Sequence, residues 1–253
     1  MAAAHHAVLD HVALAVEKVA DAPDFLVGEL GARPAGAGPG PGYAFWQWLF
    51  AHDGRLEVLE PSGPPGGFVH RFLASRGPGI HHVTFKVPKI EAAIARAEAA
   101  DYEVVGVSLE KPAWKEAFLH PKQAQGVVVQ LAESNPELQP AEWDESRWPF
   151  PELPAPAPEA ARMIGVRLVA RSEQRARHLW QDALLGECSH EDGQDGLVLF
   201  RWPDSPLRVA VRVDPAAEEG PEGLEFAPRP SAPLPQAGHH ALGARLLTVP
   251  TPR

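Results

Sequence analysis

Four residues at matched places in the first half of the chain have the chemistry of a metal site. Glu57 stands at +46 from His11 (57 − 11), and Gln130 stands at +48 from His82 (130 − 82). Two imidazoles, one carboxylate and one amide oxygen suit Zn²⁺, Fe²⁺, Co²⁺, Ni²⁺ or Mn²⁺ better than an ion that prefers thiolates. A single histidine or glutamate on a strand is more often a hydrogen-bonded structural residue or a solvated one. The repeated spacing favours a common divalent-metal site.

The two segments that carry these histidines repeat one another. Residues 80–85 read IHHVTF and residues 9–16 read LDHVALAV, so each is a short apolar run typical of a strand. Aligning His82 with His11 (82 − 11 = 71) places His81 opposite Asp10. Side chains alternate across a strand, so His81 and His82 must face opposite sides. The repeat predicts that His82 belongs to the site.

The elements around these strands predict the same order twice. In the first module a strand is followed by a helix over 21–31, a glycine- and proline-rich loop over 35–42, and two or three strands. In the second module an opening strand precedes an alanine-rich helix over 89–100 and three further strands. We therefore predict an α+β fold with tandem βαβββ modules, at about 7–62 and 80–133.

The second half of the chain predicts a related but metal-free domain. Residues 134–160 are rich in proline and are expected to form a linker, with Trp143 and Trp148 holding it against a domain surface. Residues 161–253 then open with another strand and helix, and they predict a degenerate module pair. Gly165 stands at the place of His11 and Arg208 at the place of Glu57, and neither can ligate a metal. This domain would cover the first domain's site or replace a dimer partner.

Composition limits the kind of partner. A formal charge of −10 without a basic stripe argues against nucleic acid. No apolar run is long enough for a membrane span, and the N-terminus does not resemble a signal peptide. The lone Cys188 suits a reducing compartment. We expect a cytoplasmic protein that binds a small molecule, either as a monomer with an internal pseudo-dimer or as a homodimer.

Residues 1–133 resemble the vicinal oxygen chelate superfamily, which includes glyoxalases, bleomycin resistance proteins and dioxygenases. They are most similar to its methylmalonyl-CoA epimerase branch. The resemblance implies a cupped mixed sheet around a divalent metal that holds vicinal oxygens of a small substrate, here one linked to CoA. By position, the metal ligands are His11, Glu57, His82 and Gln130. The similar segments are residues 9–16, 56–61, 76–85, 118–122 and 126–131.

The sequence departs from the epimerase pattern at the groups that move protons. The resemblance implies two carboxylates that exchange the substrate's α-proton. Gln130 stands where such epimerases carry a glutamate, and an amide cannot accept a proton at neutral pH. The strand before Glu57 reads FWQWL and offers no acid either, so Glu57 is the single catalytic base that we predict. Trp46, Gln47, Trp48 and Lys122 are the predicted substrate-binding residues, with core packing of the tryptophans as the alternative.

Three functions remain open at this point. The first is a metal-dependent lyase or isomerase that stabilises an enolate or enediolate. The second is an Fe²⁺-dependent dioxygenase that uses His11, His82 and Glu57 as a two-histidine, one-carboxylate set. The third is a small-molecule or antibiotic-binding protein without catalysis. The intact ligand set favours the two enzymes, while the absence of a second base favours the binding protein.

Overall fold

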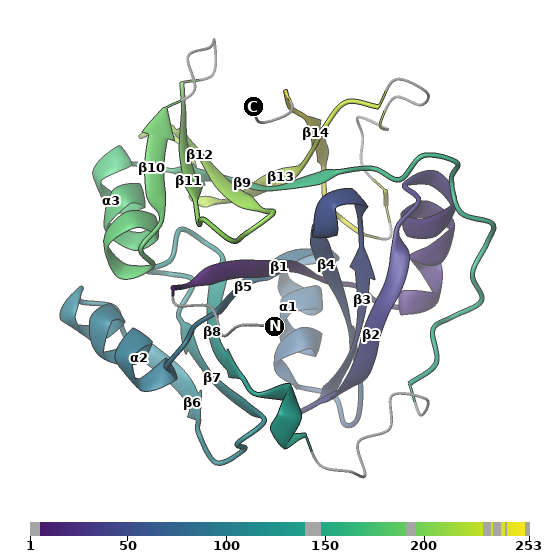
Figure 1. Ribbon diagram of the computed structural model, residues 1–253, viewed down its shortest axis with the longest axis horizontal. Coiled ribbons are helices and arrows are strands. Elements are labelled where there is room, and N and C mark those ends of the chain that lie inside the picture. The colour runs from purple at the N-terminus through teal and green to yellow at the C-terminus, as the bar shows by residue number, and fades with distance from the viewer. Residues whose placement is uncertain are drawn as a thin grey trace. The chain divides into compact units, whose positions relative to one another are not determined.

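The computed structural model describes residues 6–139, 148–190, 196–229, 234, 239–240 and 242–250. Its strands form two mixed sheets (Figure 1). The larger has eight strands in the order β2-β3-β4-β1-β5-β8-β7-β6, and the smaller has six in the order β10-β11-β12-β9-β13-β14. The first six strands in the order of the larger sheet correspond one by one to the six strands of the smaller sheet, so that β1 corresponds to β9 and β5 to β13. The α+β fold with a degenerate second module pair is therefore confirmed.

The first module supplies one side of the eight-stranded sheet. Its central strands β1 and β4 run parallel, and β3 pairs antiparallel with β4. The helix expected over 21–31 is instead two short pieces, a 3₁₀ turn followed by a π-type turn. The elements are β1 (Val8–Ala15), η1 (Val19–Asp21), η2 (Asp24–Glu29), β2 (Arg33–Gly40), β3 (Tyr43–Leu49), η3 (Ala51–Asp53) and β4 (Arg55–Pro61).

The glycine- and proline-rich segment is an edge strand, so the predicted loop over 35–42 is wrong. β2 pairs antiparallel with β3 along its length, with a register irregularity between Pro34 and Gly36. Proline is excluded from central strands because it lacks an N–H donor, but an edge strand needs donors on one side only. The outermost place of β2 in the sheet therefore accepts a composition that otherwise indicates a loop.

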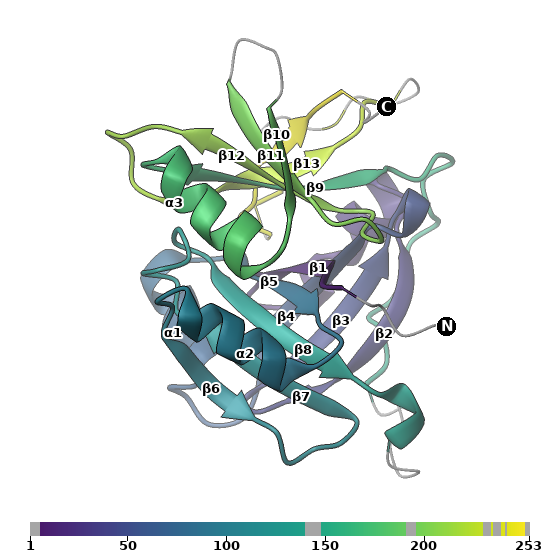
Figure 2. The same ribbon diagram turned by 60° about the vertical axis from the view of Figure 1, so that its left-hand side comes forward.

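The second module supplies the other side of the same sheet and matches its predicted elements closely. β5 runs parallel to β8, and β7 pairs antiparallel with β8. Figure 2 shows α2 lying along β6, β7 and β8. The elements are α1 (Phe68–Arg76), β5 (Gly79–Lys86), α2 (Ile90–Ala99), β6 (Val104–Ser108), β7 (Trp114–Leu119), β8 (Val128–Ser134) and η4 (Pro136–Leu138).

The register of the parallel strands is duplicated to the residue. In the first module Ala13 of β1 pairs with Glu57 of β4, and His11 lies two residues before Ala13. In the second module Thr84 of β5 pairs with Gln130 of β8, and His82 lies two residues before Thr84. The alignment of His82 with His11 therefore describes a true structural repeat. Each module places one histidine and one oxygen-bearing side chain on the same face of its strand pair.

The C-terminal half repeats the order of elements in shorter form. Strands β11 and β12 are antiparallel, and β13 runs parallel to β14. The helix expected after the opening strand is a short α-helix that continues as a π-type turn. The elements are β9 (Met163–Ala170), α3 (Glu173–Arg177), η6 (His178–Ala183), β10 (Glu187–His190), β11 (Leu197–Arg201), β12 (Arg208–Val213), β13 (Gly220–Phe226) and β14 (Leu246–Thr248).

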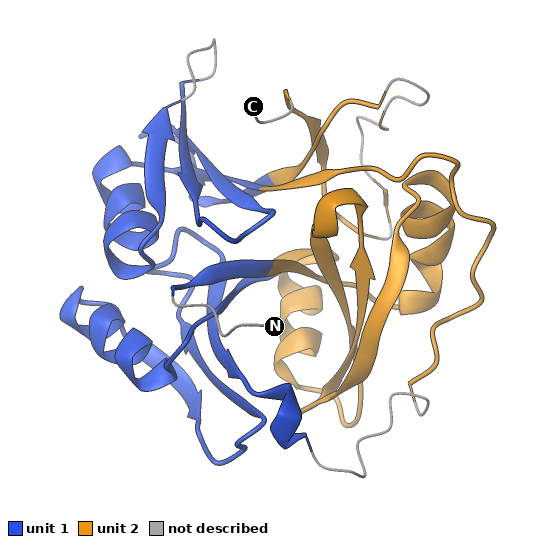
Figure 3. Ribbon diagram, viewed as in Figure 1, with its two compact units in different colours: residues 1–10, 82–143, 166–222 blue, residues 11–81, 144–165, 223–253 orange. Residues whose placement is uncertain are grey.

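Two compact units interleave the halves of the chain (Figure 3). Unit 1 takes described residues from 1–10, 82–143 and 166–222, and unit 2 from 11–81, 144–165 and 223–253. Within unit 1, the ring of Phe85 lies 4.7 Å from that of Trp202. Within unit 2, the ring of Phe50 lies 5.3 Å from that of Phe226. Aromatic packing in each unit therefore joins an N-terminal module to a C-terminal one.

Residues 148–160 of the proline-rich segment belong to unit 2. The Trp46 indole donates a hydrogen bond to the Pro149 carbonyl (3.1 Å), and the Trp48 ring meets the Phe150 ring edge-on at 5.4 Å. The backbone of Ala157 donates to Val27 (3.0 Å). Trp143, expected to anchor this segment, lies outside the described residues. Among the described helices, none is long and apolar enough to cross a membrane.

The close approach of Gly31 to Ala160 gives a stability test. A Cβ atom on Gly31, whose φ is +67°, would lie 2.9 Å from the Ala160 Cα, whereas one on Gly63 (φ +72°) would meet nothing within 4 Å. Both substitutions strain a left-handed backbone, but only the first also overpacks. We expect Gly31→Ala to lower the free energy of unfolding by about 1–3 kcal/mol more than Gly63→Ala in urea denaturation. Equal losses would contradict docking of this segment.

Candidate metal centre

Strands β1 and β4 bring His11 and Glu57 together. Because Ala13 pairs with Glu57 in parallel register, His11 shares the face of Glu57 on the neighbouring strand. The Nε2 atom of His11 lies 3.6 Å from the Oε1 atom of Glu57. Adjacent ligands of one zinc-sized ion, each about 2.1 Å from it, lie roughly 3.4 Å apart in a tetrahedral site. The spacing of this pair is therefore close to that of two ligands on one ion.

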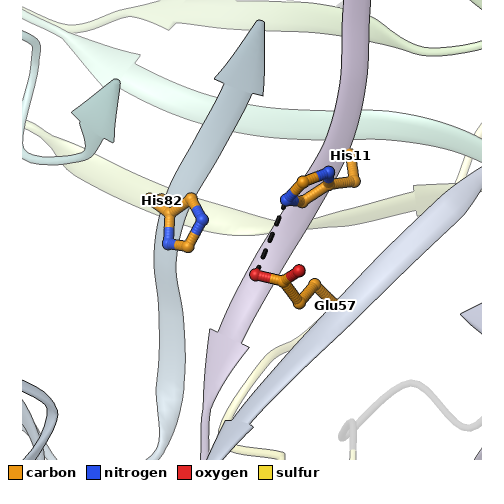
Figure 4. A group of neighbouring side chains, drawn as sticks. All are labelled: His11, Glu57 and His82. Carbon is orange, nitrogen blue, oxygen red and sulfur yellow. Dashed lines mark ion pairs between the residues drawn. The ribbon is translucent and has the colours of Figure 1, made fainter. Parts of the chain in front are cut away.

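His82 completes a group of three ligand side chains (Figure 4). One ligand atom from each of His11, Glu57 and His82 lies within 4.8 Å of the other two. In the figure the three side chains, from β1, β4 and β5, point toward one another. They are 2%, 7% and 6% exposed, respectively. A buried set of two imidazoles and one carboxylate is the donor chemistry that a divalent transition metal requires, so these residues fit such an ion.

The Glu57 carboxylate is oriented by a chain of hydrogen bonds within unit 2. Its Oε2 atom accepts from the Gln47 Nε2 (2.7 Å), while its Oε1 atom faces His11. The Gln47 Oε1 in turn accepts from an Arg55 guanidinium nitrogen (2.7 Å). An acceptor facing Arg55 forces the amide's N–H toward Glu57. Gln47, predicted to bind substrate, therefore contacts the candidate ligand and orients it.

Gln130 occupies the corresponding place in unit 1. It lies buried on β8, and its Oε1 atom accepts a hydrogen bond from the Thr84 hydroxyl (2.6 Å). Since Thr84 lies two residues after His82, Gln130 shares the face of that histidine. Its Nε2 atom donates to Glu116 Oε2 (2.8 Å). Gln130 is thus placed beside His82 as Glu57 is beside His11, and its role as fourth ligand stays a prediction.

His81 lies on the opposite face of β5 from His82, as strand alternation requires. Its ring packs against Phe68 and Phe72 of α1, with ring centroids 5.3 and 4.9 Å away. Burial lowers the pKa of His81 to about 4, so its imidazole is neutral at pH 7. His81 thus packs among aromatic rings on the face of β5 opposite His82.

The remaining predicted substrate-binding residues lie elsewhere. Trp46 and Trp48 alternate with Gln47 on β3, so they face away from Glu57, and both are buried. Lys122 is exposed and lines an open cavity of about 1090 Å³ in unit 1. The rest of that cavity's lining comes from 100–102, Gln123 and residues of α3 and η6, and it includes no member of the cluster. Contact of these three side chains with a substrate stays a prediction.

The second sheet carries different side chains at the matching places. Gly165 lies on β9, and Arg208 lies on β12 with 3% exposure. On β13 and β14, Glu225 pairs with Leu247 in parallel register. That the C-terminal modules bind no metal stays a prediction.

Three residues that hydrogen-bond to Gln47 or Gln130 went unpredicted: Arg55, Thr84 and Glu116. Thr84 could have been recognised from the sequence, because it lies two residues after His82 and must share its face of the strand. Arg55 could have been recognised in the same way, because it lies two residues before Glu57 on one strand. Glu116 could not have been recognised in this way, since its contact with Gln130 depends on the pairing of β7 with β8.

Comparison with known proteins agrees with this fold. The family model of the glyoxalase/bleomycin resistance protein/dioxygenase superfamily matches residues 10–137, about half of the chain. The chain belongs to this superfamily. It is 32% identical over 136 residues to human mitochondrial methylmalonyl-CoA epimerase, covering 50% of this chain and 73% of the relative. It is 31% identical over 130 residues to the ethylmalonyl-CoA/methylmalonyl-CoA epimerase of Cereibacter sphaeroides, covering 49% and 95%.

A structural match extends across both halves of the chain. A triple variant of 4-hydroxymandelate synthase from Streptomyces coelicolor superposes with a TM-score of 0.60 at 14% identity. The match covers 88% of this chain and 71% of that protein. At this identity the likeness shows the fold alone. It confirms that the C-terminal modules belong to the same architecture as the N-terminal pair.

Paired histidine variants test the metal centre. A chelator first removes any bound metal. We then expect the protein to bind about one Co²⁺ per chain, measured by visible absorption. His82→Ala should weaken binding by at least roughly 100-fold, more than the loss of a residue that only orients a ligand. His81→Leu, next along β5 but on its other face, should stay within about 3-fold of the wild type, the scale of a change without ligand contact. Equal effects of the two variants would contradict the cluster.

Proposed function

We propose that this protein is a divalent-metal-dependent isomerase or lyase that handles the enolate or enediolate of a small CoA-linked substrate. The observation that carries this proposal is the buried cluster of His11, Glu57 and His82. These residues would hold the ion, with Gln130 as fourth ligand. When bound, a divalent metal supplies Lewis-acid stabilisation of the negative charge that develops on a substrate oxygen.

Glu57 is the base in this proposal. Its Oε2 atom is turned away from His11 and hydrogen-bonded to Gln47, and it is the atom on which we place the substrate's α-proton. The C–H bond breaks, its electron pair enters the enolate, and the proton passes to the carboxylate. Return of the proton from Glu57 restores the C–H bond, and epimerisation requires the planar enolate first to turn its other face toward this carboxylate. Gln130 cannot serve as a second base because an amide does not accept a proton.

Names of relatives support the substrate class. The human and Cereibacter relatives are epimerases of methylmalonyl-CoA, and the latter also of ethylmalonyl-CoA. The range that the family model matches, 10–137, includes all four predicted ligands. A thioester's α-proton is acidic enough for one carboxylate to exchange it when the enolate is stabilised. We therefore propose a CoA thioester with an acidic α-proton as the preferred substrate.

Deuterium exchange tests this chemistry directly. In D₂O the metal-saturated protein should exchange the α-proton of methylmalonyl-CoA, measured by mass spectrometry, and the chelated protein should not. Glu57→Gln, compared at saturating metal, should slow exchange by roughly 10²–10⁴-fold because it removes the base. His81→Leu is the matched control. Absence of exchange in metal-saturated wild type would remove the proposal.

A dioxygenase is the second candidate. Two histidines and one carboxylate are also the set that holds Fe²⁺ for oxygen activation. Oxygen uptake by the Fe²⁺-loaded protein with catechol-like substrates, lost in His82→Ala, would support this function over the first. A protein that binds no metal at all would instead favour a non-catalytic binding role.

A further inference from the structure

The Gln130 amide is held at both ends by residues of unit 1. Its Nε2 donates to Glu116 Oε2 (2.8 Å), and its Oε1 accepts from the Thr84 hydroxyl (2.6 Å). The two ends of an amide have nearly the same shape, so its surroundings decide which way it faces. For a metal site the choice matters, because the carbonyl oxygen can ligate a cation and the NH₂ group cannot.

Glu116 makes that choice on chemical grounds. An ionised carboxylate only accepts hydrogen bonds, so it admits the NH₂ end of Gln130 and rejects the oxygen. The Trp114 indole donates to the same Glu116 Oε2 atom (3.0 Å) and fixes its position. Thr84 is the weaker partner, since a hydroxyl both donates and accepts and would tolerate either end. Glu116 is thus the group that turns the oxygen toward β5, the strand of His82.

The first module orients its oxygen ligand by the same device with the residue types exchanged. There the acid Glu57 lies on β4 and the amide Gln47 on the preceding strand β3. In the second module the amide Gln130 lies on β8 and the acid Glu116 on the preceding strand β7. Arg55 fixes Gln47 as Trp114 fixes Glu116. Glu116 lies two residues from Phe118, the direct partner of Gln130, and therefore reaches it diagonally.

We propose that Glu116 is a positioning residue that fixes the carbonyl oxygen of Gln130 as the fourth ligand of the metal centre. This inference rests on the proposed metal-dependent function. Glu116 acts through Gln130 and touches neither metal nor substrate. The role of an outer partner of this kind is worth roughly 10- to 100-fold in metal affinity.

Two substitutions at one position separate this role from the alternatives. Glu116→Leu removes the acceptor and frees the amide to turn. Glu116→Gln keeps an oxygen that can accept from both Gln130 and Trp114, without the charge. We expect Co²⁺ affinity to fall roughly 10- to 100-fold in Glu116→Leu and to recover to within about 3-fold of wild type in Glu116→Gln. Glu98→Leu, which removes an exposed glutamate of α2, controls for net charge.

A double-mutant cycle completes the test. In a Gln130→Ala background, Glu116→Leu should change Co²⁺ affinity by less than about 2-fold, because the group that it orients is gone. An undiminished effect there, or unchanged affinity in Glu116→Leu alone, overturns the proposal. So does a Glu116→Gln variant that binds Co²⁺ normally but loses deuterium exchange, which would make Glu116 a proton carrier. Thermal denaturation of each variant excludes loss of folding as the cause.

The proposed function and this inference fail in different ways. A wild-type protein that binds no Co²⁺ removes both. A wild-type protein that binds Co²⁺ tightly and loses nothing in Glu116→Leu removes only the role of Glu116.

Discussion

The buried carboxylate of Glu57 is the constraint on which the candidate site depends. An ionised carboxylate taken out of water without partners costs several kcal/mol, so its surroundings must supply donors or a cation. β3 supplies the Gln47 N–H to one oxygen, and β1 places His11 beside the other. These contacts place the two carboxylate oxygens of Glu57 in different surroundings. One faces the imidazole group that would share a metal, and the other is held by an amide that Arg55 has already oriented.

Duplication of the parallel register explains why two histidines meet at one site. The pairs Ala13–Glu57 and Thr84–Gln130 are equivalent, so each module delivers a histidine and an oxygen-bearing side chain to one face of the eight-stranded sheet. The smaller sheet repeats the strand order, with Gly165 and Arg208 at the places that the sequence aligns with His11 and Glu57. The same order of strands therefore carries different side chains in the two sheets. Function in this fold depends on a few side chains rather than on topology.

The distribution of acids and amides defines what chemistry the site can perform. Glu57 is an acid at a ligand place, while Gln130 is an amide at the equivalent place. In the second module the acid Glu116 lies one strand further out and contacts the amide. Negative charge is therefore present in both modules but adjoins the histidines in only one. Such an arrangement suits a metal centre with a single proton-accepting ligand.

Local sequence determined much of this protein. The strand motif around each of His11 and His82, the alternation that separates His81 from His82, and the helix at α2 all depend on neighbours a few residues away. Tertiary structure alone decided the features that depend on strand partners. A glycine- and proline-rich segment became β2 because an edge strand needs donors on one side only, and Glu116 found Gln130 through a diagonal cross-strand contact. The interleaving of the two units likewise depends on aromatic contacts such as Phe85 with Trp202, which join residues far apart in the chain and leave no local pattern.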